Sequence, residues 1–333
     1  MPIIDNAIYV GGRRITDPQS LDQTFEYMRD SRGMAWIGLF RPTREEIETV
    51  AAEFSLHPLA VEDALSGHQR AKIERYGDIL FTVLRPARYI ESSETVEFGE
   101  LHVFVGPDFV VTVRHAEVPD LAHVRKRLES HPELLARGPE AVLYAILDEV
   151  VDEYAPVVQG IQDDVDEIED DLFTVSAGPE LSRRIYDLSR EVILFQRATE
   201  PLREMLEGLL RGADKYGVDI ELQRALRDVL DHTLRIVGRS ASLRSLLDNA
   251  LTVNATLVTQ RQTEAALLQG EQVKKISGWA AVLFAPTLVG TVYGMNFVHM
   301  PELDWAWGYP AALGLMVATS VTLWVVFRRR KWM

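Results

Sequence analysis

The residues best suited to binding chemistry end a long uncharged run, in the segment Tyr293-Gly294-Met295-Asn296-Phe297. The amide oxygen of Asn296 and the neighbouring backbone carbonyls can accept hydrogen bonds from the water shell of a cation, without the deep binding that carboxylates would give. A helix C-terminus, whose dipole is negative, also favours a cation at this point. A second interpretation stays open, because an asparagine in a glycine-containing helix end is more often an ordinary C-cap.

Acidic side chains supply other candidate cation ligands. Glu302 and Asp304 follow the uncharged run, where they would either attract cations or serve only a turn and solubility. Asp63 and Asp228 are far apart in the sequence, so an ordinary surface position is the default for each. Seven carboxylates fall within residues 163–171. Such a run attracts cations weakly, but it is more often the solvated face of a helix.

The sequence lacks the patterns that are typical of enzymes and of nucleic-acid-binding proteins. Its eight histidines form no zinc-protease motif, and no phosphate-binding loop is present, so ATP-driven pumping is not expected. His57 and His68 are interpreted as fold or interface residues. The absence of cysteine excludes disulfides, thiolate metal sites and cysteine nucleophiles. The net charge of −15 argues against a nucleic-acid partner. The chain is therefore predicted not to be an enzyme and to need no cofactor.

Two uncharged stretches predict a membrane protein. Residues 276–298 and 305–327 contain no charged side chain, and each has 23 residues, whereas a membrane-spanning helix needs about 20. The alternative is a buried helical hairpin in a soluble protein. Charge asymmetry opposes that alternative, because Lys274 and Lys275 precede the first stretch and four basic residues follow the second, at 328–331.

The same charges predict the orientation in the membrane. By the positive-inside rule both termini face the cytoplasm, and only a short loop lies outside. Trp305, Trp307 and Tyr309 at the outer edge and Trp332 at the inner edge fit interfacial anchors. The predicted location is the cell membrane (inner or plasma membrane), with about 270 residues in the cytosol.

The segment before the first span is predicted to have two parts. Residues 1–138 alternate strand and helix patterns, which favours a sheet covered by helices. Strands are expected at 3–10, 34–40, 79–85, 101–105 and 109–114, the last two joined in a hairpin by residues 106–108. Thr43 and Glu46 have capping-box spacing and predict a helix to about Phe54. Residues 139–215 predict an antiparallel helical hairpin, with Ile161, Val165, Ile168 and Leu172 on one buried face.

A single helix is expected to run from about Val218 to Val292. No proline occurs between Pro201 and Pro286, and apolar residues recur at helical spacing into the first span. About 75 residues would extend roughly 110 Å, so the helix needs packing partners that one chain does not supply. Self-association is the natural answer.

At this point the sequence resembles the CorA family of magnesium and cobalt transport proteins. The resemblance rests on the segment from Tyr293 to Phe297, followed by Met300-Pro301-Glu302-Leu303, between two C-terminal spans. Further matches cover most of the chain. They are His57-Pro58-Leu59, Glu62-Asp63, His68-Gln69-Arg70, Lys72, Arg227-Asp228-Val229 and Asp231-His232-Thr233.

The resemblance implies a fold and an assembly. The expected fold class is an α/β cytosolic domain, an α/β/α sandwich, followed by a long stalk helix and two transmembrane helices in a homopentamer. The expected segments are the stalk at 216–275, a pore-lining span at 276–298, an external loop at 299–308, a second span at 309–327 and a basic cytosolic tail at 328–333. The stalk between Leu251 and Val273 is longer than in better-known relatives, which leaves its register open.

The resemblance also implies a function. Tyr293, Gly294, Met295 and Asn296 would form a selectivity filter for hydrated Mg²⁺, which enters down the membrane potential. The pathway would be lined and gated by a stripe of residues at helical spacing: Thr287, Thr291, Phe284, Ile276 and Val273. Asp63 and Asp228 would bind regulatory Mg²⁺ between subunits, and Glu302 and Asp304 would attract cations at the outer mouth. Co²⁺ or Ni²⁺ are further expected substrates.

Two alternatives remain at this stage. One is transport of zinc or another divalent metal, as in the zinc branch of the same superfamily, although Met295 between Gly294 and Asn296 favours the magnesium branch. The other is a two-span membrane sensor or scaffold without conductance. The expected partners are other copies of the chain, the lipid bilayer and the divalent cation.

Overall fold

The computed structural model describes residues 3–67, 70–116, 118–174, 179–296, 300–301 and 304–332. The chain divides into two compact units, Met1–Asn254 and Ala255–Met333. One helix, α9 (Ile220–Tyr293), has residues in both units and confirms the prediction of one long uninterrupted helix.

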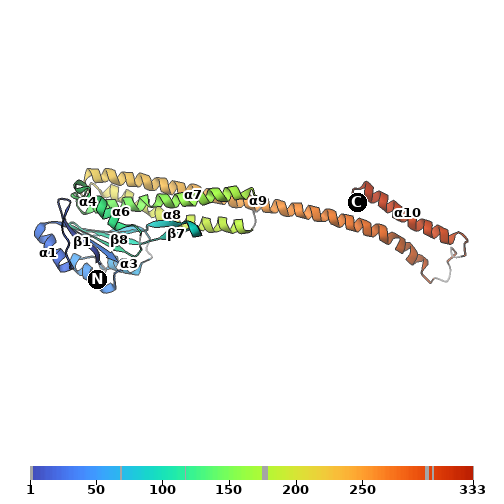
Figure 1. Cartoon of the computed structure of the whole chain (residues 1–333), viewed down its shortest axis with the longest axis horizontal. Helices are drawn as coiled ribbons and strands as arrows, with labels where there is room; N and C mark the ends of the chain where they lie inside the picture. Colours follow the sequence, from blue (N-terminus) through green and yellow to red (C-terminus); the bar gives the residue numbers. More distant parts are fainter. Residues whose placement is uncertain are drawn as a thin grey trace. The chain divides into compact units, whose positions relative to one another are not determined.

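A seven-stranded sheet forms the centre of the first unit (Figure 1). Its strands, in spatial order, are β2 (Arg13–Thr16), β1 (Ile3–Val10), β3 (Met34–Phe40), β9 (Phe109–Arg114), β8 (Leu101–Val105), β5 (Ile79–Leu84) and β4 (Lys72–Tyr76). The β3–β9 pair is parallel, and the other five pairs are antiparallel. Strands β6 (Ala87–Ile90) and β7 (Thr95–Phe98) form a separate hairpin.

The five predicted strands and the β8–β9 hairpin are confirmed, with β5 ending one residue earlier than expected. Strands β2, β4, β6 and β7 were not predicted. These strands have four or five residues each, and each contains at least one charged side chain, so they lack the apolar run that marked the equally short β8.

Helices cover both faces of the sheet, as Figure 1 shows for α1 and α3 on one side and α4 and α6 on the other. The first group is α1 (Leu21–Ser31), α2 (Arg44–Phe54) and α3 (Pro58–Ser66). The second is α4 (Leu121–Glu129), α5 (Pro132–Leu135), α6 (Pro139–Asp152), α7 (Tyr154–Leu172), α8 (Pro179–Gly212) and the first part of α9. The predicted α/β/α sandwich is confirmed.

Side-chain alternation along the central strands explains the two cores. In β3, Trp36 belongs to the core beneath the second helix group, whereas Ala35 and Ile37 belong to the core beneath the first. Both neighbours are fully buried, so the strand reads as a continuous apolar run. The predicted capping box is also present, since Thr43 and Glu46 hydrogen-bond reciprocally at the start of α2.

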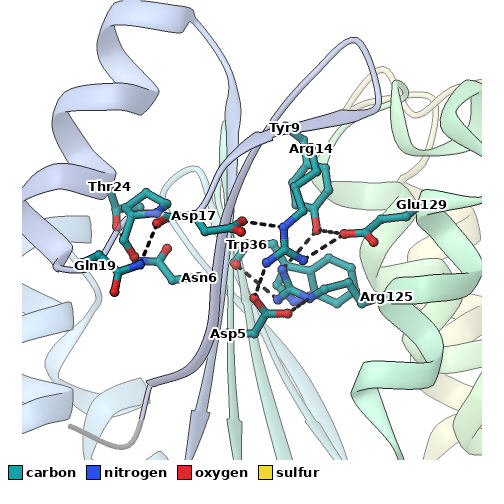
Figure 2. Close-up of polar contacts among 11 residues, drawn as sticks. Asp5, Asn6, Tyr9, Arg14, Asp17, Gln19, Thr24, Trp36, Arg125 and Glu129 are labelled. Atoms are coloured by element: carbon teal, nitrogen blue, oxygen red, sulfur yellow. Dashed lines mark hydrogen bonds and ion pairs between the residues drawn. The ribbon is translucent and has the colours of Figure 1, made fainter.

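A polar cluster joins one edge of the sheet to α4 (Figure 2). The Arg125 guanidinium, on α4, is buried and pairs with Asp5 at 3.0 Å. It also donates hydrogen bonds to the Tyr9 hydroxyl and the Trp36 carbonyl, and lies 4.0 Å from the centre of a Trp36 ring. Arg14, on β2, adds ion pairs to Asp5, Asp17 and Glu129. Two cations and three carboxylates therefore hold β1, β2 and α4 together.

Helix α7 buries the predicted face of Ile161, Val165, Ile168 and Leu172. The seven carboxylates of residues 163–171 were predicted to form a solvated face, and this holds with one exception. Six of the seven carboxylates are exposed, but Asp164 is half-buried, accepts a hydrogen bond from Tyr89 and pairs with Arg184. Burial raises the pKa of Asp164. This contact links α7 to the β6–β7 hairpin and to α8.

The second unit contains the end of α9 and the helix α10 (Gly308–Arg329). Both are long and apolar enough to cross a membrane. They pack antiparallel through close contacts: the Ser320 hydroxyl donates to the Val282 carbonyl at 3.3 Å, and a Cβ added at Gly290 would lie 3.5 Å from the Met316 methyl group. Val289 and Ala312 are buried in the same unit.

Candidate functional site

The uncharged run 276–298 continues past the end of its helix. Tyr293 is the last residue of α9, after which the Gly294 N–H bonds to the Gly290 carbonyl at 2.9 Å and the Met295 N–H bonds to the Val292 carbonyl at 3.3 Å. Asn296 lies just beyond the helix and is exposed. Gly294 does not have a positive φ. A Cβ added at Gly294 would lie 3.4 Å from the Gly290 carbonyl oxygen and 3.6 Å from the Thr291 carbonyl oxygen, so glycine leaves these helix-end carbonyls uncovered.

The predicted stripe lies on one exposed face of α9. Val273, Ile276 and Phe284 are 53%, 70% and 68% exposed, and Thr287 and Thr291 are also exposed. Large apolar side chains with this exposure require a cover of lipid or of another protein surface.

This stripe faces away from α10. An α-helix turns about 100° per residue, so residues two positions apart lie on nearly opposite faces. Thr287 and Thr291 are each two positions from the buried Val289. Phe284 is two positions from Val282, whose carbonyl accepts the bond from Ser320 on α10. Helix α10 therefore covers one side of α9 and leaves the stripe on the opposite side open.

The two threonines present acceptors on this open face. The Thr287 hydroxyl donates to the Phe284 carbonyl at 2.6 Å, and the Thr291 hydroxyl donates to the Thr287 carbonyl at 2.8 Å. Each proton is thus used within the helix, so the remaining lone pairs of the oxygen point to acceptor roles. The water molecules around a divalent cation are hydrogen-bond donors, and these oxygens match them.

The structure gives Asp63 a partner within its own chain. The Asp63 carboxylate, on α3, lies 2.7 Å from the Lys72 ammonium on β4, and the same ammonium lies 3.0 Å from Glu74. Burial alone would lower the pKa of Lys72, but its hydrogen bonds to Asp63 and Glu74 raise it. Lys72 therefore stays charged and partly neutralises both carboxylates.

Asp228 is on α9, with a side chain that is 70% exposed. The His232 ring lies between two carboxylates, 3.7 Å from Asp228 and 3.6 Å from Asp152 on α6. Within one chain the two predicted regulatory aspartates contact different residues. Across the described residues, no group of three or more histidine, aspartate or glutamate side chains is arranged to hold a metal ion.

The remaining predicted residues have simpler positions. Asp304 is exposed just before α10, whereas Glu302 and His68 lie outside the described residues. His57 caps α3 by accepting the Leu59 N–H, and its ring stacks on Tyr76 at 4.2 Å. The interpretation of His57 as a fold residue is confirmed.

Comparison with models of known protein families shows to which family the chain belongs. The model of the family described as CorA-like Mg²⁺ transporter protein matches residues 31–329. The chain belongs to the CorA family. The match covers the sheet from β3 onward, the long helix and both apolar spans, and it leaves β1 and β2 outside.

Individual CorA-family proteins and related chains support the same assignment. The YfjQ protein of Bacillus subtilis is 32% identical over 298 residues, covering 89% of each chain. The cobalt/magnesium transport protein CorA of Thermotoga maritima is 29% identical over 308 residues, covering 92% of this chain and 85% of the relative. The structure of the CorA magnesium transporter from Methanocaldococcus jannaschii matches with a TM-score of 0.69 and 19% identity over 100% of both chains, which shows a shared fold.

The sequence did not reveal the Lys72–Asp63 pair. Lys72 was noted for its motif, but the strand that brings it next to α3 is only five residues long and was not predicted. The threonine hydroxyl bonds were equally hidden, although threonine at helical spacing inside an apolar span is a usable signal for such bonds.

Proposed function

We propose that several copies of this chain form a channel for Mg²⁺ influx, each contributing the open face of α9 to a shared pathway. The observation that carries the proposal is the exposed stripe of α9, opposite the α10-packed face, which ends at Tyr293, Gly294, Met295 and Asn296. Membership of a family described as CorA-like Mg²⁺ transporters supports Mg²⁺ as the ion that passes. Five copies is the number that the resemblance implies.

The filter in this proposal recognises a hydrated ion. Mg²⁺ holds its water tightly and prefers octahedral oxygen ligation, so a fast pathway must grip the water shell and leave it in place. A ring of Asn296 amide oxygens and backbone carbonyls accepts hydrogen bonds from that shell without a carboxylate's deep binding. Thr287 and Thr291 continue the same acceptor chemistry further along the stripe. Co²⁺ and Ni²⁺, which are also hydrated divalent cations, are expected to pass.

The gate in this proposal is apolar. Val273, Ile276 and Phe284 would surround a narrow pathway from which water withdraws, and a hydrated ion cannot cross such a segment. Widening of the assembly would rewet it. Because the stripe carries no charge between Lys275 and the helix end, no residue there would hold the ion back.

Direction and regulation complete the proposal. The protein would lie in the cell membrane with both termini in the cytoplasm. A divalent ion that enters a negative interior gains roughly 4.6 kcal/mol per 100 mV of membrane potential. Asp63 and Asp228 of neighbouring subunits would bind cytosolic Mg²⁺ and hold the closed arrangement. Asp304 and Glu302 would raise the local cation concentration at the outer mouth.

Proteoliposomes that contain a magnesium-sensitive dye test the proposal. We expect the wild-type protein to admit Mg²⁺ when a negative interior potential is imposed, and Asn296→Ala to reduce the initial rate at least tenfold. Asn249→Ala is the matched control, because Asn249 is an exposed asparagine elsewhere on α9. No influx in the wild type would leave a sensor or scaffold role. Zn²⁺ influx that excess Mg²⁺ fails to inhibit would favour a zinc transporter.

A further inference from the structure

The end of α10 presents a cluster of positive charge with an ordered backbone. Arg328, Arg329, Arg330 and Lys331 are consecutive, and we call them the basic cap. The sequence has no carboxylate between Trp305 and Trp332, so α10 itself offers the cap no counter-charge.

Two residues of α9 lie at the same level as the basic cap. In an antiparallel pair, each step forward along one helix matches a step backward along the other. Ser320 meets Val282 in this unit. Eight residues further along α10 is Arg328, and eight residues back along α9 is Lys274, followed by Lys275. Six basic side chains therefore lie at one end of the α9–α10 pair, with Glu271 the nearest carboxylate on α9, one turn away.

The cap has a defined conformation. Lys331 has a φ of 59° and the Lys331 N–H bonds to the Arg328 carbonyl at 3.2 Å, while the Trp332 N–H bonds to the Phe327 carbonyl at 2.9 Å. This pair of bonds is the Schellman motif, in which the left-handed position is usually glycine. Lysine occupies it here, which keeps a fourth positive charge at a position where an uncharged glycine would fit more easily.

Aromatic rings place this cap at a lipid boundary. The Trp332 ring stacks on Phe327 with centroids 5.4 Å apart, and the Arg328 guanidinium lies 4.9 Å from the centre of a Trp324 ring. Tryptophan concentrates where hydrocarbon meets headgroups. The arginines follow directly on the uncharged stretch of α10, so the proposed membrane placement puts them at the depth of lipid phosphates.

We propose that the basic cap, with Lys274 and Lys275, binds the phosphate headgroups of anionic phospholipids in the inner leaflet. Guanidinium groups bind phosphate oxygens through paired hydrogen bonds, and clusters of basic residues next to a span favour anionic lipid. The proposal rests on the membrane placement given under Proposed function, but it does not depend on the ion that passes.

The same cap could instead face an acidic surface of a second copy. The continuity of the cap with a membrane span favours lipid, because phosphates lie beside these residues whatever the arrangement of the copies. The Trp332–Phe327 stack also gives the site an apolar floor, which a lipid glycerol and acyl chain would cover and a carboxylate-rich helix would not.

Quenching of Trp332 by brominated lipids tests the proposal in the full-length protein. Vesicles contain phosphatidylcholine with brominated chains or phosphatidylglycerol with brominated chains, and the difference between the wild type and Trp332→Phe isolates the signal of Trp332. We expect phosphatidylglycerol to bind next to Trp332 at least fivefold more strongly than phosphatidylcholine. Equal quenching by the two lipids would overturn the proposal.

Variants of the cap complete the test. Replacing the three arginines with glutamine together with Lys331→Gly should bring the ratio of phosphatidylglycerol binding to phosphatidylcholine binding close to one. The glycine at position 331 keeps the left-handed backbone. The control removes the same number of positive charges from a different helix, α9, at Arg235, Arg239, Arg244 and Arg261, and should keep the preference for phosphatidylglycerol. If both variants lose it, bulk charge and not the cap attracts the lipid. If the cap variant keeps the preference but dissociates into single chains, the cap binds a second copy and the proposal is wrong.

Discussion

The carboxylate of Asp63 lies 2.7 Å from the ammonium group of Lys72, so an aspartate assigned to cation binding already has a cation beside it. The two side chains come from α3 and β4 and are 21% and 29% exposed. A Mg²⁺ ion at Asp63 must therefore displace the ammonium or share the carboxylate with it. Lys72 is expected to weaken cytosolic Mg²⁺ binding and to set the concentration at which the assembly closes.

Replacing Lys72 tests this competition. Lys72→Gln removes a positive charge beside Asp63 and should increase the affinity for Mg²⁺, because two charges a few ångströms apart near a protein surface interact by about 4 kcal/mol before solvent and side-chain rearrangement reduce it. We expect the internal Mg²⁺ concentration that halves influx to fall about two- to tenfold. Lys126→Gln, at an exposed position of α4, is the control. An unchanged or higher concentration for Lys72→Gln would contradict the competition.

A second prediction concerns Glu153, which lies at the junction between α6 and α7. Burial, with the nearby Glu149 and Asp120 carboxylates, raises the pKa of Glu153 to about 7. A carboxyl whose pKa is higher in the folded state than in the unfolded state stabilises the fold only while it is protonated. Its contribution is complete below about pH 4.5 and is lost as the pH rises through about 7.

Glu153→Gln should remove this pH dependence. The pKa shift corresponds to about 3 kcal/mol at most, and solvent screening of a half-buried group reduces it to about 1 kcal/mol. We expect the variant to unfold a few degrees higher than the wild type at pH 8 and at nearly the same temperature at pH 5. Thermal unfolding of the full-length protein in detergent measures this. Asp163→Asn, which neutralises an exposed carboxylate on α7, should show no such difference between the two pH values.

A third prediction concerns the polar cluster of Figure 2. Arg125→Ala would leave Asp5 and the Tyr9 hydroxyl without their buried partner and remove the ring contact with Trp36. Breaking a buried ion pair costs about 3–5 kcal/mol, and the remaining pair of Asp5 with Arg14 brings the expected loss to the lower end of that range. Urea unfolding followed by far-ultraviolet circular dichroism should show a loss of this size in the free energy of unfolding. Arg13→Ala on β2, an exposed position, should cost less than about 0.5 kcal/mol. A similar small loss at Arg125 would show that the cluster does not stabilise the fold.

Much of the fold could be predicted because its signals are long or local. The runs of β1, β3, β8 and β9 are apolar and bounded by turn residues, and α9 lacks proline over most of its length. Strands β2, β4, β6 and β7 could not be predicted, since they are short and, unlike β8, include charged side chains that interrupt the apolar pattern. Pairing between distant segments was equally inaccessible: no local pattern tells that Tyr89 bonds to Asp164, or that Arg125 stacks on Trp36.

The candidate site was predictable to a different degree. Helical spacing placed Ile276, Phe284 and Thr287 on one face, but only the contacts of Val282 with Ser320 and of Gly290 with Met316 show that α10 lies on the opposite face. The regulatory aspartates came from the resemblance alone, because a contact between copies leaves no spacing in the sequence of one chain.

The central claim, that the open face of α9 lines a shared pathway for Mg²⁺, is tested most directly by cysteine accessibility. The wild-type chain contains no cysteine, so Thr287→Cys supplies a single reactive thiol on the stripe. In proteoliposomes with imposed potential, a charged methanethiosulfonate reagent should reduce Mg²⁺ influx through Thr287→Cys at least fivefold. It should leave influx through Leu313→Cys, on the exposed side of α10, unchanged. Labelling of both thiols with undiminished influx through Thr287→Cys would contradict the claim.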